Sequence, residues 1–385
     1  MSTARVCSTC TAVPIRARRG INRGRKPRRI PACARNGGSS SRELLDADSL
    51  ETLDLSDVTV IIPARNEADV IGATLKALKQ QGKGLHVILV DDESIDGTAN
   101  IARKVELENI QIILSEPLPS GWTGKLWAQE QGLQRVQTPL VLLLDADILL
   151  KPGLLSALKA KRNAESLHFV SLMAMLKVDT VWEKMLMPAF IYFFKMLYPF
   201  ALANKPTSKV AAAAGGCILV DTQALQGIGG MAAIQDAVID DCTLAKKIKQ
   251  AGYKTWLGLT HGVISQRGYV SLTEIWDMVA RTAYTQLFYS KSLLLVCTVL
   301  MSLMYLLPWY GLIFFTGSAW FFSVLALLIM CGLYLPTLHF YALNNAWALC
   351  MPVIAGLYLL MTWTSAIRYW QGERLRWKGR IYQKG

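Results

Sequence analysis

The stretch PLVLLLDAD, residues 139–147, places two carboxylates directly after a run of apolar residues. Leu140–Leu144 is uninterrupted by polar side chains, which predicts a short strand buried on both faces. Binding crevices of open α/β sheets lie at the carboxyl ends of strands, so Asp145 and Asp147 are expected at such a crevice. Two carboxylates on one loop suit Mg²⁺ or Mn²⁺, which keeps water and phosphate oxygens as its other ligands. A D-x-D by itself also fits a strand followed by a polar turn, and the surrounding sequence has to decide between the two.

The residues before this stretch alternate between strand and helix patterns. The predicted elements are a strand at Val58–Ile62, a helix at Glu67–Gln81, a strand at His86–Val90, a helix starting at the Asp96-Gly97 turn, a strand at Ile110–Leu114 and a helix from Trp122 to Val136. This β-α-β-α-β order predicts an α/β fold with a parallel, Rossmann-like sheet. Further strands are expected at Phe169–Met175 and Cys217–Val220, and a helix from Asp240 that ends at Gly252.

Polar residues lie beside the ends of the predicted strands, where a nucleotide sugar would bind. The expected substrate contacts are Pro63, Ala64, Asn66 and Glu67 after the first strand, Asp91 and Asp92 after the second, and Gly216 before a later one. The two aspartates are placed to accept hydrogen bonds from a base or a ribose. Lys125 opens a helix together with backbone amides, and a helix N-terminus favours the charge of a diphosphate. A lysine at a helix start also occurs simply because it is well solvated.

Several functions are disfavoured by what the chain lacks. No G-x-G-x-x-G follows the first strand, and Gly227–Gly230 comes too late to serve as one, which disfavours a dinucleotide oxidoreductase. The basic N-terminal arm has neither aromatic residues nor a folded motif, so no nucleic-acid partner is expected. The eight cysteines are scattered, and Cys7-x-x-Cys10 has no matching pair, so we interpret it as incidental rather than as a metal site. A reducing compartment is expected for the active part.

The net charge of +13 is concentrated near the two ends of the chain. Residues 1–42 contain ten Arg and one Lys but no acidic residue. This composition is similar to that of an organelle transit peptide, including a plastid one, and equally to a disordered basic arm that contacts anionic lipid. A mis-assigned start codon is a third explanation. Residues 43–57 are acidic and are interpreted as a linker or short helix.

Residues 292–367 contain no Asp, Glu, Lys or Arg, which is enough for three membrane spans, near 293–316, 318–340 and 347–367. Residues 182–203 resemble a helix in the membrane interface, with a pair of core helices as the alternative. Residues 271–290 predict one long amphipathic helix. The preceding domain, 58–291, and the basic tail, 368–385, both favour the cytosolic side, whereas three spans would separate them. Either one segment is re-entrant or this preference is overridden.

The order and spacing of these motifs resemble the family 2 glycosyltransferases with the GT-A fold. The resemblance covers about residues 58–290 and rests on VTVIIPARNE, VILVDDESIDGT, GKLWAQEQG, LLLDAD and the pair Asp240-Asp241. WTGKLWA, the DDC form of the acidic pair and the closing WKGRIY look most like the hopene-associated glycosyltransferases. Membrane-bound carotenoid and ceramide glycosyltransferases are similar too.

The resemblance implies an inverting transfer without a covalent enzyme intermediate. Asp241 would then deprotonate the acceptor hydroxyl, with Asp240 beside it as part of the catalytic pair. Both also fit residues that cap the N-terminus of a helix. The metal at Asp145 and Asp147 would stabilise charge on the departing nucleoside diphosphate.

Two other residues have two interpretations each. Arg281 stands in MVART, where processive relatives carry Q/R-x-x-R-W; the departure favours transfer of a single sugar over polymer synthesis. Its side chain would contact diphosphate or cap an interfacial helix. His261 would be a third metal ligand or a buried histidine with satisfied hydrogen bonds.

The sequence therefore predicts a membrane-bound glycosyltransferase that uses Mg²⁺ or Mn²⁺ and a nucleoside-diphosphate sugar. Its acceptor would be a lipid hydroxyl of hopanoid, isoprenoid or sphingolipid type, with the catalytic domain on the cytosolic or stromal face. A polyprenyl-phosphate acceptor and a non-catalytic nucleotide-binding membrane scaffold are the alternatives, and no protein partner is expected.

Overall fold

The computed structural model of this protein describes residues 43–47, 53–377 and 380–383. The predicted basic arm and part of the acidic linker lie outside the described residues. Contacts group Arg42–Gly385 into one unit.

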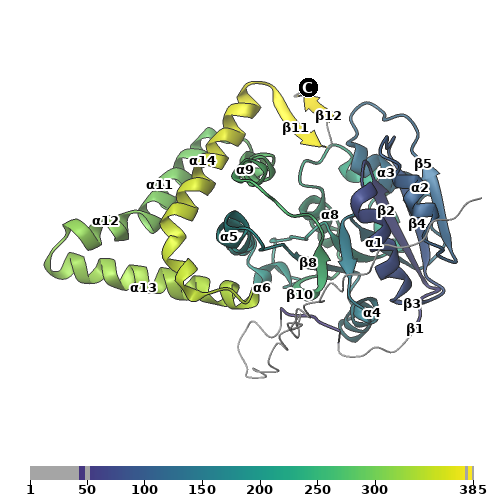
Figure 1. Cartoon of the computed structure of the whole chain (residues 1–385), viewed down its shortest axis with the longest axis horizontal. Helices are drawn as coiled ribbons and strands as arrows, with labels where there is room; N and C mark the ends of the chain where they lie inside the picture. The colour runs from purple at the N-terminus through teal and green to yellow at the C-terminus, as the bar shows by residue number, and fades with distance from the viewer. Residues whose placement is uncertain (1–42, 48–52, 378–379, 384–385) are drawn as a thin grey trace, which may run out of the picture. The chain divides into compact units, whose positions relative to one another are not determined.

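An eight-stranded sheet forms the centre of this unit (Figure 1). Its order is β5-β4-β2-β6-β9-β8-β10-β7. The strands are β2 (Val58–Ala64), β4 (His86–Asp91), β5 (Ile110–Leu114), β6 (Leu140–Leu144), β7 (Ile148–Leu150), β8 (Phe169–Met175), β9 (Cys217–Asp221) and β10 (Thr255–Ser265). Two short pairs lie outside the sheet: β1 (Leu53–Asp54) with β3 (Gly82–Lys83), and β11 (Glu373–Trp377) with β12 (Arg380–Gln383).

The prediction that the sheet is parallel is correct for one half of its strands and wrong for the sheet as a whole. Strands β5, β4, β2 and β6 are parallel neighbours, as the β-α-β alternation predicts. Strand β9, however, runs antiparallel to both β6 and β8, and β7 runs antiparallel to β10. The long helix between β8 and β9, Val181–Leu197, packs mainly with the apolar C-terminal helices and not on a face of the sheet, where the crossover helix of a parallel connection would lie. The result is a mixed sheet.

Helices cover both faces of the sheet. On one face lie α1 (Ala68–Lys79), α2 (Thr98–Arg103) and α4 (Leu154–Glu165); on the other lie α3 (Gly124–Leu133), α7 (Thr222–Gly227), the 3₁₀ helix η2 (Gly230–Ile234) and α8 (Asp240–Gln250). Successive strand residues point to opposite faces, so Val60 packs in the first layer and Ile61 in the second. A Cβ on Gly132 of α3 would lie 2.7 Å from Ile61 Cγ2, which explains why glycine stands where α3 meets β2.

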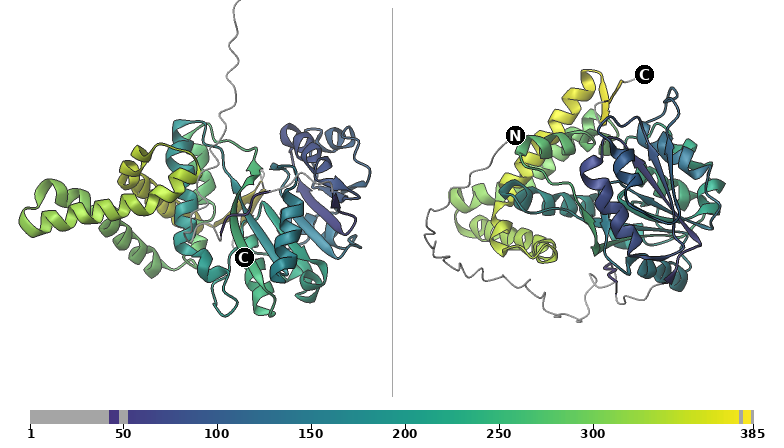
Figure 2. Two further views of the ribbon diagram at one scale, coloured as in Figure 1. Left: turned by 90° about the horizontal axis from the view of Figure 1, so that it is seen from below. Right: turned by 45° about the vertical axis from the view of Figure 1, so that its right-hand side comes forward.

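Three apolar helical segments follow the sheet domain, as predicted. Lys291–Phe314, Gly317–Phe340 and Asn345–Trp370 are each long and apolar enough to cross a membrane. They consist of α11 (Lys291–Tyr305) with α12 (Leu307–Phe314), α13 (Gly317–Phe340), and the 3₁₀ helix η3 (Asn345–Cys350) with α14 (Met351–Trp370). Figures 1 and 2 show these green-to-yellow helices together on one side of the sheet.

Two shorter helices, α5 (Val181–Leu197) and α9 (Leu272–Ala280), join the sheet domain to the apolar helices. Between α5 and β9 comes α6 (Phe200–Ala203). Met185, Leu186 and Met187 of α5 and Ile275 of α9 are buried in one cluster with side chains of α13 and α14. Segment 182–203 therefore packs much of its surface against protein.

The predicted single helix over residues 271–290 is wrong. The chain forms α9 and then α10 (Ala283–Gln286), with Arg281 and Thr282 at the break. Tyr284 is buried beneath α14, and its backbone N–H donates to Ser365 Oγ at 3.0 Å. The helix breaks next to this contact with α14, and the amphipathic periodicity of residues 271–290 carries no information about such a contact.

Candidate active site

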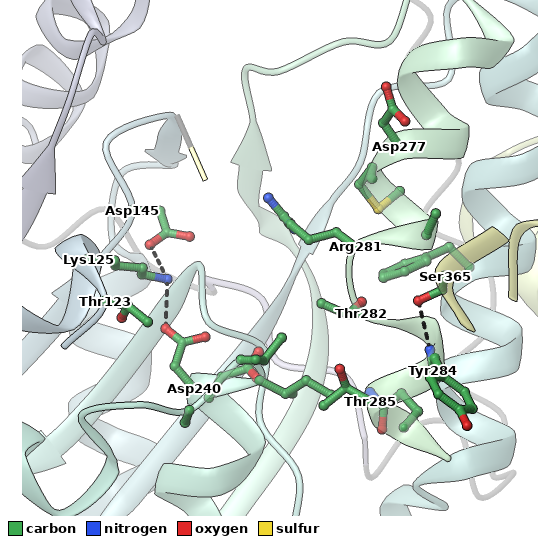
Figure 3. Close-up of a pocket in the computed structure, with 18 of the residues that line it drawn as sticks. Thr123, Lys125, Asp145, Asp240, Asp277, Arg281, Thr282, Tyr284, Thr285 and Ser365 are labelled. Carbon is green, nitrogen blue, oxygen red and sulfur yellow. Dashed lines mark hydrogen bonds and ion pairs between the residues drawn. The ribbon is translucent and has the colours of Figure 1, made fainter. Parts of the chain in front are cut away.

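A cavity of about 640 Å³ opens beside the carboxyl ends of β2 and β6. One wall comes from the sheet domain and includes Pro63, Asp145 and the start of α8. The opposite wall comes from α9, α10 and the end of α14, with Phe190 and Phe194 of α5 (Figure 3). The cavity thus connects the predicted D-x-D site with the helices that lead to the apolar segments.

Lys125 lies at the centre of the acidic end of this cavity. Its Nζ is 2.9 Å from Asp145 Oδ1 and 3.2 Å from Asp240 Oδ2, so the first turn of α3 is joined to β6 and α8. Burial alone lowers the pKa of a lysine, but the attraction of Asp145 and Asp240 outweighs it and raises the pKa of Lys125. The ammonium group therefore stays charged, and the solvated-lysine alternative is wrong.

Asp241 lies in the first turn of α8, whose N-cap is Ile239. Neither Asp240 nor Asp241 is therefore the cap residue. Asp241 Oδ1 accepts a hydrogen bond from its neighbour's backbone, Cys242 N, at 2.7 Å. Burial, followed by repulsion from Asp240, raises the pKa of Asp241 to about 7. A carboxylate with that pKa is suited to exchange a proton near neutral pH.

Gly215 was missed in the sequence, where only its neighbour Gly216 stood out. A Cβ on Gly215 would lie 3.3 Å from Asp241 Oδ2 and 3.4 Å from Lys125 Nζ, so a side chain there would crowd both groups. Gly216 does not line the cavity; its carbonyl accepts a hydrogen bond from Asp145 N at 3.1 Å. Gly216 thus holds the D-x-D loop through a backbone hydrogen bond and does not face the cavity.

Asp145 and Asp147 both face the cavity, each beside a basic side chain. Asp145 contacts Lys125, and Asp147 Oδ2 is 3.1 Å from Arg267 Nε. Burial raises the pKa of Asp145, with repulsion from Asp147 adding to it. A cation at this loop would stabilise the charged form of both.

The charges that line the cavity fit a divalent cation. Among the described residues, eight carboxylates and four basic side chains line it. No group of three or more metal-binding side chains is arranged as a complete cage in the described ranges. Asp145 and Asp147 would therefore hold Mg²⁺ or Mn²⁺ as two carboxylate ligands, with water and phosphate oxygens completing the shell.

Other predicted substrate residues form a separate hydrogen-bonded turn and do not line the cavity. Asp91 Oδ1 accepts from Ser94 N, and Asn66 Oδ1 accepts from Ile95 N, both at 3.0 Å. Asp92 is buried with its carboxylate 3.5 Å from Arg65 Nη1. Ala64, the last residue of β2, accepts a hydrogen bond from Asp92 N. Pro63 and Glu67 of the same predicted group do line the cavity.

Arg281 caps a helix, as one of its two interpretations has it, whereas its contact with a diphosphate stays a prediction. It is the C-cap residue of α9, and its backbone N–H donates to Asp277 O. Its side chain extends across the cavity toward Lys125 and Asp145 (Figure 3). This guanidinium is therefore placed to meet an anion between the two walls.

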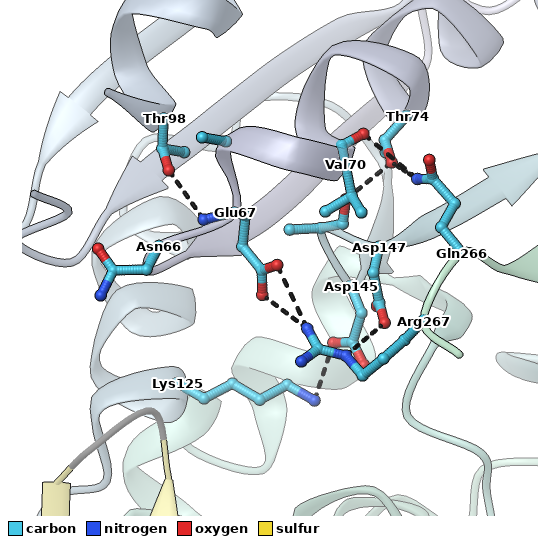
Figure 4. A network of polar contacts seen from close by, with 12 residues as sticks. Asn66, Glu67, Val70, Thr74, Thr98, Lys125, Asp145, Asp147, Gln266 and Arg267 are labelled. Atoms are coloured by element: carbon cyan, nitrogen blue, oxygen red, sulfur yellow. Dashed lines mark hydrogen bonds and ion pairs between the residues drawn. The ribbon is translucent and has the colours of Figure 1, made fainter. Parts of the chain in front are cut away.

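Arg267 is a cavity residue that the sequence analysis missed. It follows β10 and contacts Asp147 and Glu67, joining the ends of three strands (Figure 4). The available signal was a basic residue directly after the last long strand of the sheet.

His261 does not line the cavity, so its expected role as a third metal ligand is not supported. Its Nδ1 lies 3.0 Å from Asp46 Oδ2, and its Nε2 lies 3.2 Å from the carbonyl oxygen of Phe340. The hydrogen bond with Asp46 raises the pKa of His261, with Phe340 O adding to the effect. The alternative of a histidine with satisfied hydrogen bonds describes it.

We expect the Asp46–His261 pair to stabilise the fold more at low pH than at high pH. Because the folded pKa of His261 is raised, its contribution is complete below its ordinary pKa of about 6.5 and is lost as pH rises through the folded value. Asp46→Asn should lower the free energy of unfolding by about 1 kcal/mol or less, since the pair is partly exposed. Thermal unfolding near pH 6 and pH 9 measures the difference from wild type.

The control is Asp57→Asn, which removes a partly buried contact with Lys159 that involves no histidine. Its effect should be similar at the two pH values. An Asp46→Asn effect that is equal at both, or larger near pH 9, contradicts the assignment.

The sequence pattern of the family Glycosyl transferase family 2 matches residues 59–229. Those residues run from β2 to the end of α7 and include Lys125, Asp145 and Asp147. Residues 59–229 form a family 2 glycosyl transferase domain. The predicted family is confirmed for these residues, and the narrower likeness to the hopene-associated glycosyltransferases stays a prediction.

Two curated relatives are 4,4'-diaponeurosporenoate glycosyltransferases. The one from Staphylococcus haemolyticus is 34% identical and the one from Staphylococcus aureus (strain USA300) 35% identical, each over 91 residues. Each alignment covers 24% of this chain and 24% of the relative. The chain thus aligns with about a quarter of the length of these relatives.

A solved structure shares the fold over most of the chain. The mannosyltransferase PcManGT from Pyrobaculum calidifontis, in complex with GDP-Man and Mn²⁺, superimposes with a TM-score of 0.51 at 19% identity. The likeness covers 84% of this chain and 91% of that chain. The predicted GT-A fold is confirmed, with a mixed sheet in place of a wholly parallel one.

Proposed function

We propose that this family 2 protein is a membrane-bound glycosyltransferase that moves one sugar from a nucleoside-diphosphate sugar to a lipid hydroxyl, with inversion. One observation carries the proposal. Lys125, Asp145, Asp147 and the pair Asp240–Asp241 converge in one cavity, and the opposite wall of that cavity leads to the apolar helices. Donor chemistry and access from a bilayer thus meet in a single space.

Asp241 is the proposed base. Its pKa of about 7 lets a useful fraction be ionised at neutral pH. It accepts the proton of the acceptor hydroxyl as the oxygen attacks the sugar carbon. Asp240 holds Lys125 at 3.2 Å and, by repulsion, keeps the proton affinity of Asp241 high.

Charge on the departing diphosphate is the second requirement. Lys125 is permanently charged at the start of α3, where backbone amides also favour an anion. Mg²⁺ or Mn²⁺, when bound by Asp145 and Asp147, supplies a Lewis acid that stabilises the leaving group. Arg281 reaches the same space from α9. The mannosyltransferase that shares this fold was solved with GDP-Man and Mn²⁺, which agrees with this choice of donor and metal.

The acceptor enters from the membrane side. Phe190, Phe194, Met278, Tyr289 and Tyr369 line that part of the cavity. Apolar and tyrosine side chains suit a lipid whose polar end lies near the headgroup level. The expected lipid is of hopanoid, isoprenoid or sphingolipid type. We place this catalytic domain on the cytosolic or stromal face, where nucleotide sugars would reach it.

A second candidate has an acceptor that is already an anion, as in the polyprenyl-phosphate alternative. Arg281 favours it, because its guanidinium extends into the cavity from the membrane-side wall. The curated relatives are named for diaponeurosporenoate, whose ending denotes a carboxylate. An anionic oxygen needs no base, so this candidate predicts that Asp241→Asn keeps substantial activity.

The test is sugar transfer by membranes that contain the full chain. Labelled UDP and GDP sugars are supplied with Mn²⁺ or Mg²⁺, and the extracted lipids are identified by mass. We expect a labelled lipid that is absent with Asp145→Asn membranes. If the purified protein binds a nucleotide sugar but the membranes transfer none of the labelled sugars to lipid, the non-catalytic nucleotide-binding scaffold replaces this proposal.

A further inference from the structure

The backbone around Arg267 is fixed to the D-x-D loop. Gln266 N donates to Asp147 O at 2.8 Å, and Gln266 Nε2 donates to Thr74 Oγ1 at 2.8 Å. Thr74 Oγ1 in turn donates to Ala146 O at 2.7 Å. The segment therefore keeps one position relative to Asp147.

The other side of this segment is fixed as well. Tyr269 N donates to Glu183 Oε1 at 2.6 Å, and Glu183 also accepts from Thr180 N at the start of α5. These contacts hold the backbone on both sides of Arg267, whose long side chain can change position without moving either contact. This side chain is 43% exposed and lines the cavity.

The guanidinium of Arg267 joins two carboxylates that face the donor end of the cavity. Its Nε lies 3.1 Å from Asp147 Oδ2, and its Nη2 lies 3.2 and 3.3 Å from the two carboxylate oxygens of Glu67 (Figure 4). Arginine stays charged at any physiological pH. A metal ion that binds Asp147 is therefore repelled by the permanently charged guanidinium that contacts the same carboxylate.

A guanidinium released from Asp147 would remain within the cavity, since its backbone is anchored on both sides. A diphosphate offers it two oxygens in the geometry that arginine binds best. The loss of one ion pair would then be offset by another, but only when metal and diphosphate are both present.

We propose that Arg267 makes metal binding and donor binding depend on each other. Without donor it bridges Asp147 and Glu67 and opposes the metal; with donor it leaves Asp147 and binds the diphosphate. This inference rests on the proposed function and adds the residue that enforces joint binding. Linkage requires the effect to be reciprocal, with coupling of about 5- to 150-fold for typical sites.

The experiment titrates Mn²⁺ into the full chain in detergent and measures free Mn²⁺ by electron paramagnetic resonance. Titrations are made alone and with saturating UDP or GDP. For wild type we expect weak binding of Mn²⁺ alone and about tenfold tighter binding with one of the two nucleotides. Arg267→Ala should bind Mn²⁺ alone at least about threefold more tightly, and the nucleotide should then strengthen Mn²⁺ binding by a smaller factor than in wild type, because only direct ligation by its phosphate oxygens remains.

Two further variants separate this effect from altered folding. Arg267→Lys keeps the charge and should return the binding of Mn²⁺ alone toward the wild-type value. Arg162→Ala is the matched control. Arg162 donates two hydrogen bonds to the carboxylate of Asp221, and neither residue lines the cavity. This variant should behave as wild type in both titrations.

Two outcomes overturn the proposal while the proposed function stands. One is Mn²⁺ binding alone that is unchanged or weaker in Arg267→Ala, and the other is nucleotide enhancement that survives in it undiminished. If neither UDP nor GDP changes Mn²⁺ binding by wild type, the donor assignment falls, and this inference falls with it.

Discussion

Asp241→Asn is expected to lower the rate of sugar transfer to a hydroxyl acceptor by about 10²- to 10⁴-fold, the usual contribution of a general base. The amide has nearly the same shape but cannot accept the proton. Because the pKa of Asp241 is raised to about 7, wild-type activity should increase as pH rises through that value. Initial rates measured from about pH 5.5 to 8.5 test both statements.

Asp240→Asn supplies the matching variant. Removing the neighbouring negative charge should lower the pKa of Asp241, so the rising limb of the pH profile should move to lower pH. Asp57→Asn, outside the cavity, should leave the profile unchanged. Substantial activity of Asp241→Asn with no rising limb would instead support an acceptor that is already anionic.

Asp145→Asn is expected to lower the transfer rate by about 10²- to 10³-fold and to weaken Mn²⁺ binding. The substitution removes one of two carboxylates available to the metal. It also removes the closest partner of Lys125, at 2.9 Å, so the ammonium loses the contact that positions it. Rates across a range of Mn²⁺ concentrations, with Mn²⁺ binding measured separately, distinguish the two effects.

A chelator such as EDTA should abolish wild-type activity, and added Mn²⁺ or Mg²⁺ should restore it. Asp221→Asn is the control, because this aspartate contacts Arg162 and does not line the cavity. Full activity in chelator would mean that Lys125 and Arg267 alone neutralise the diphosphate, and the metal assignment would be abandoned.

The parts of the fold that the sequence predicted best depend on local patterns. Strands β2, β4, β5 and β6 begin within a residue of their predicted starts, and the three apolar segments agree within a few residues. Both signals are strong because burial on two faces or in a bilayer demands an apolar side chain at nearly every position. Motif order then identified the family, which the comparison confirmed.

The errors arose where distant segments meet. Strand β9 runs antiparallel to both β6 and β8, and the apolar pattern of a strand does not record its direction. The break between α9 and α10 coincides with the burial of Tyr284 beneath α14, more than eighty residues later in the chain. Asp91, the last residue of β4, accepts from Ser94 N, and Asp92 pairs with Arg65; both lie outside the cavity lining, and their contact with a base or ribose stays a prediction.

By itself, the sequence determined which chemical groups this protein has: carboxylates after strands, a lysine at a helix start and an apolar stretch over residues 292–367. Side-chain type and short-range periodicity are local properties, so they are readable without a structure. Only the tertiary structure decided which charges meet, because Lys125 contacts Asp240 across 115 positions and Arg267 contacts Glu67 across 200. Electrostatic interactions depend on distance in space and not on separation along the chain. The shifted pKa values in the cavity and the contacts of Arg267 with Asp147 and Glu67 could therefore be identified only from the tertiary structure.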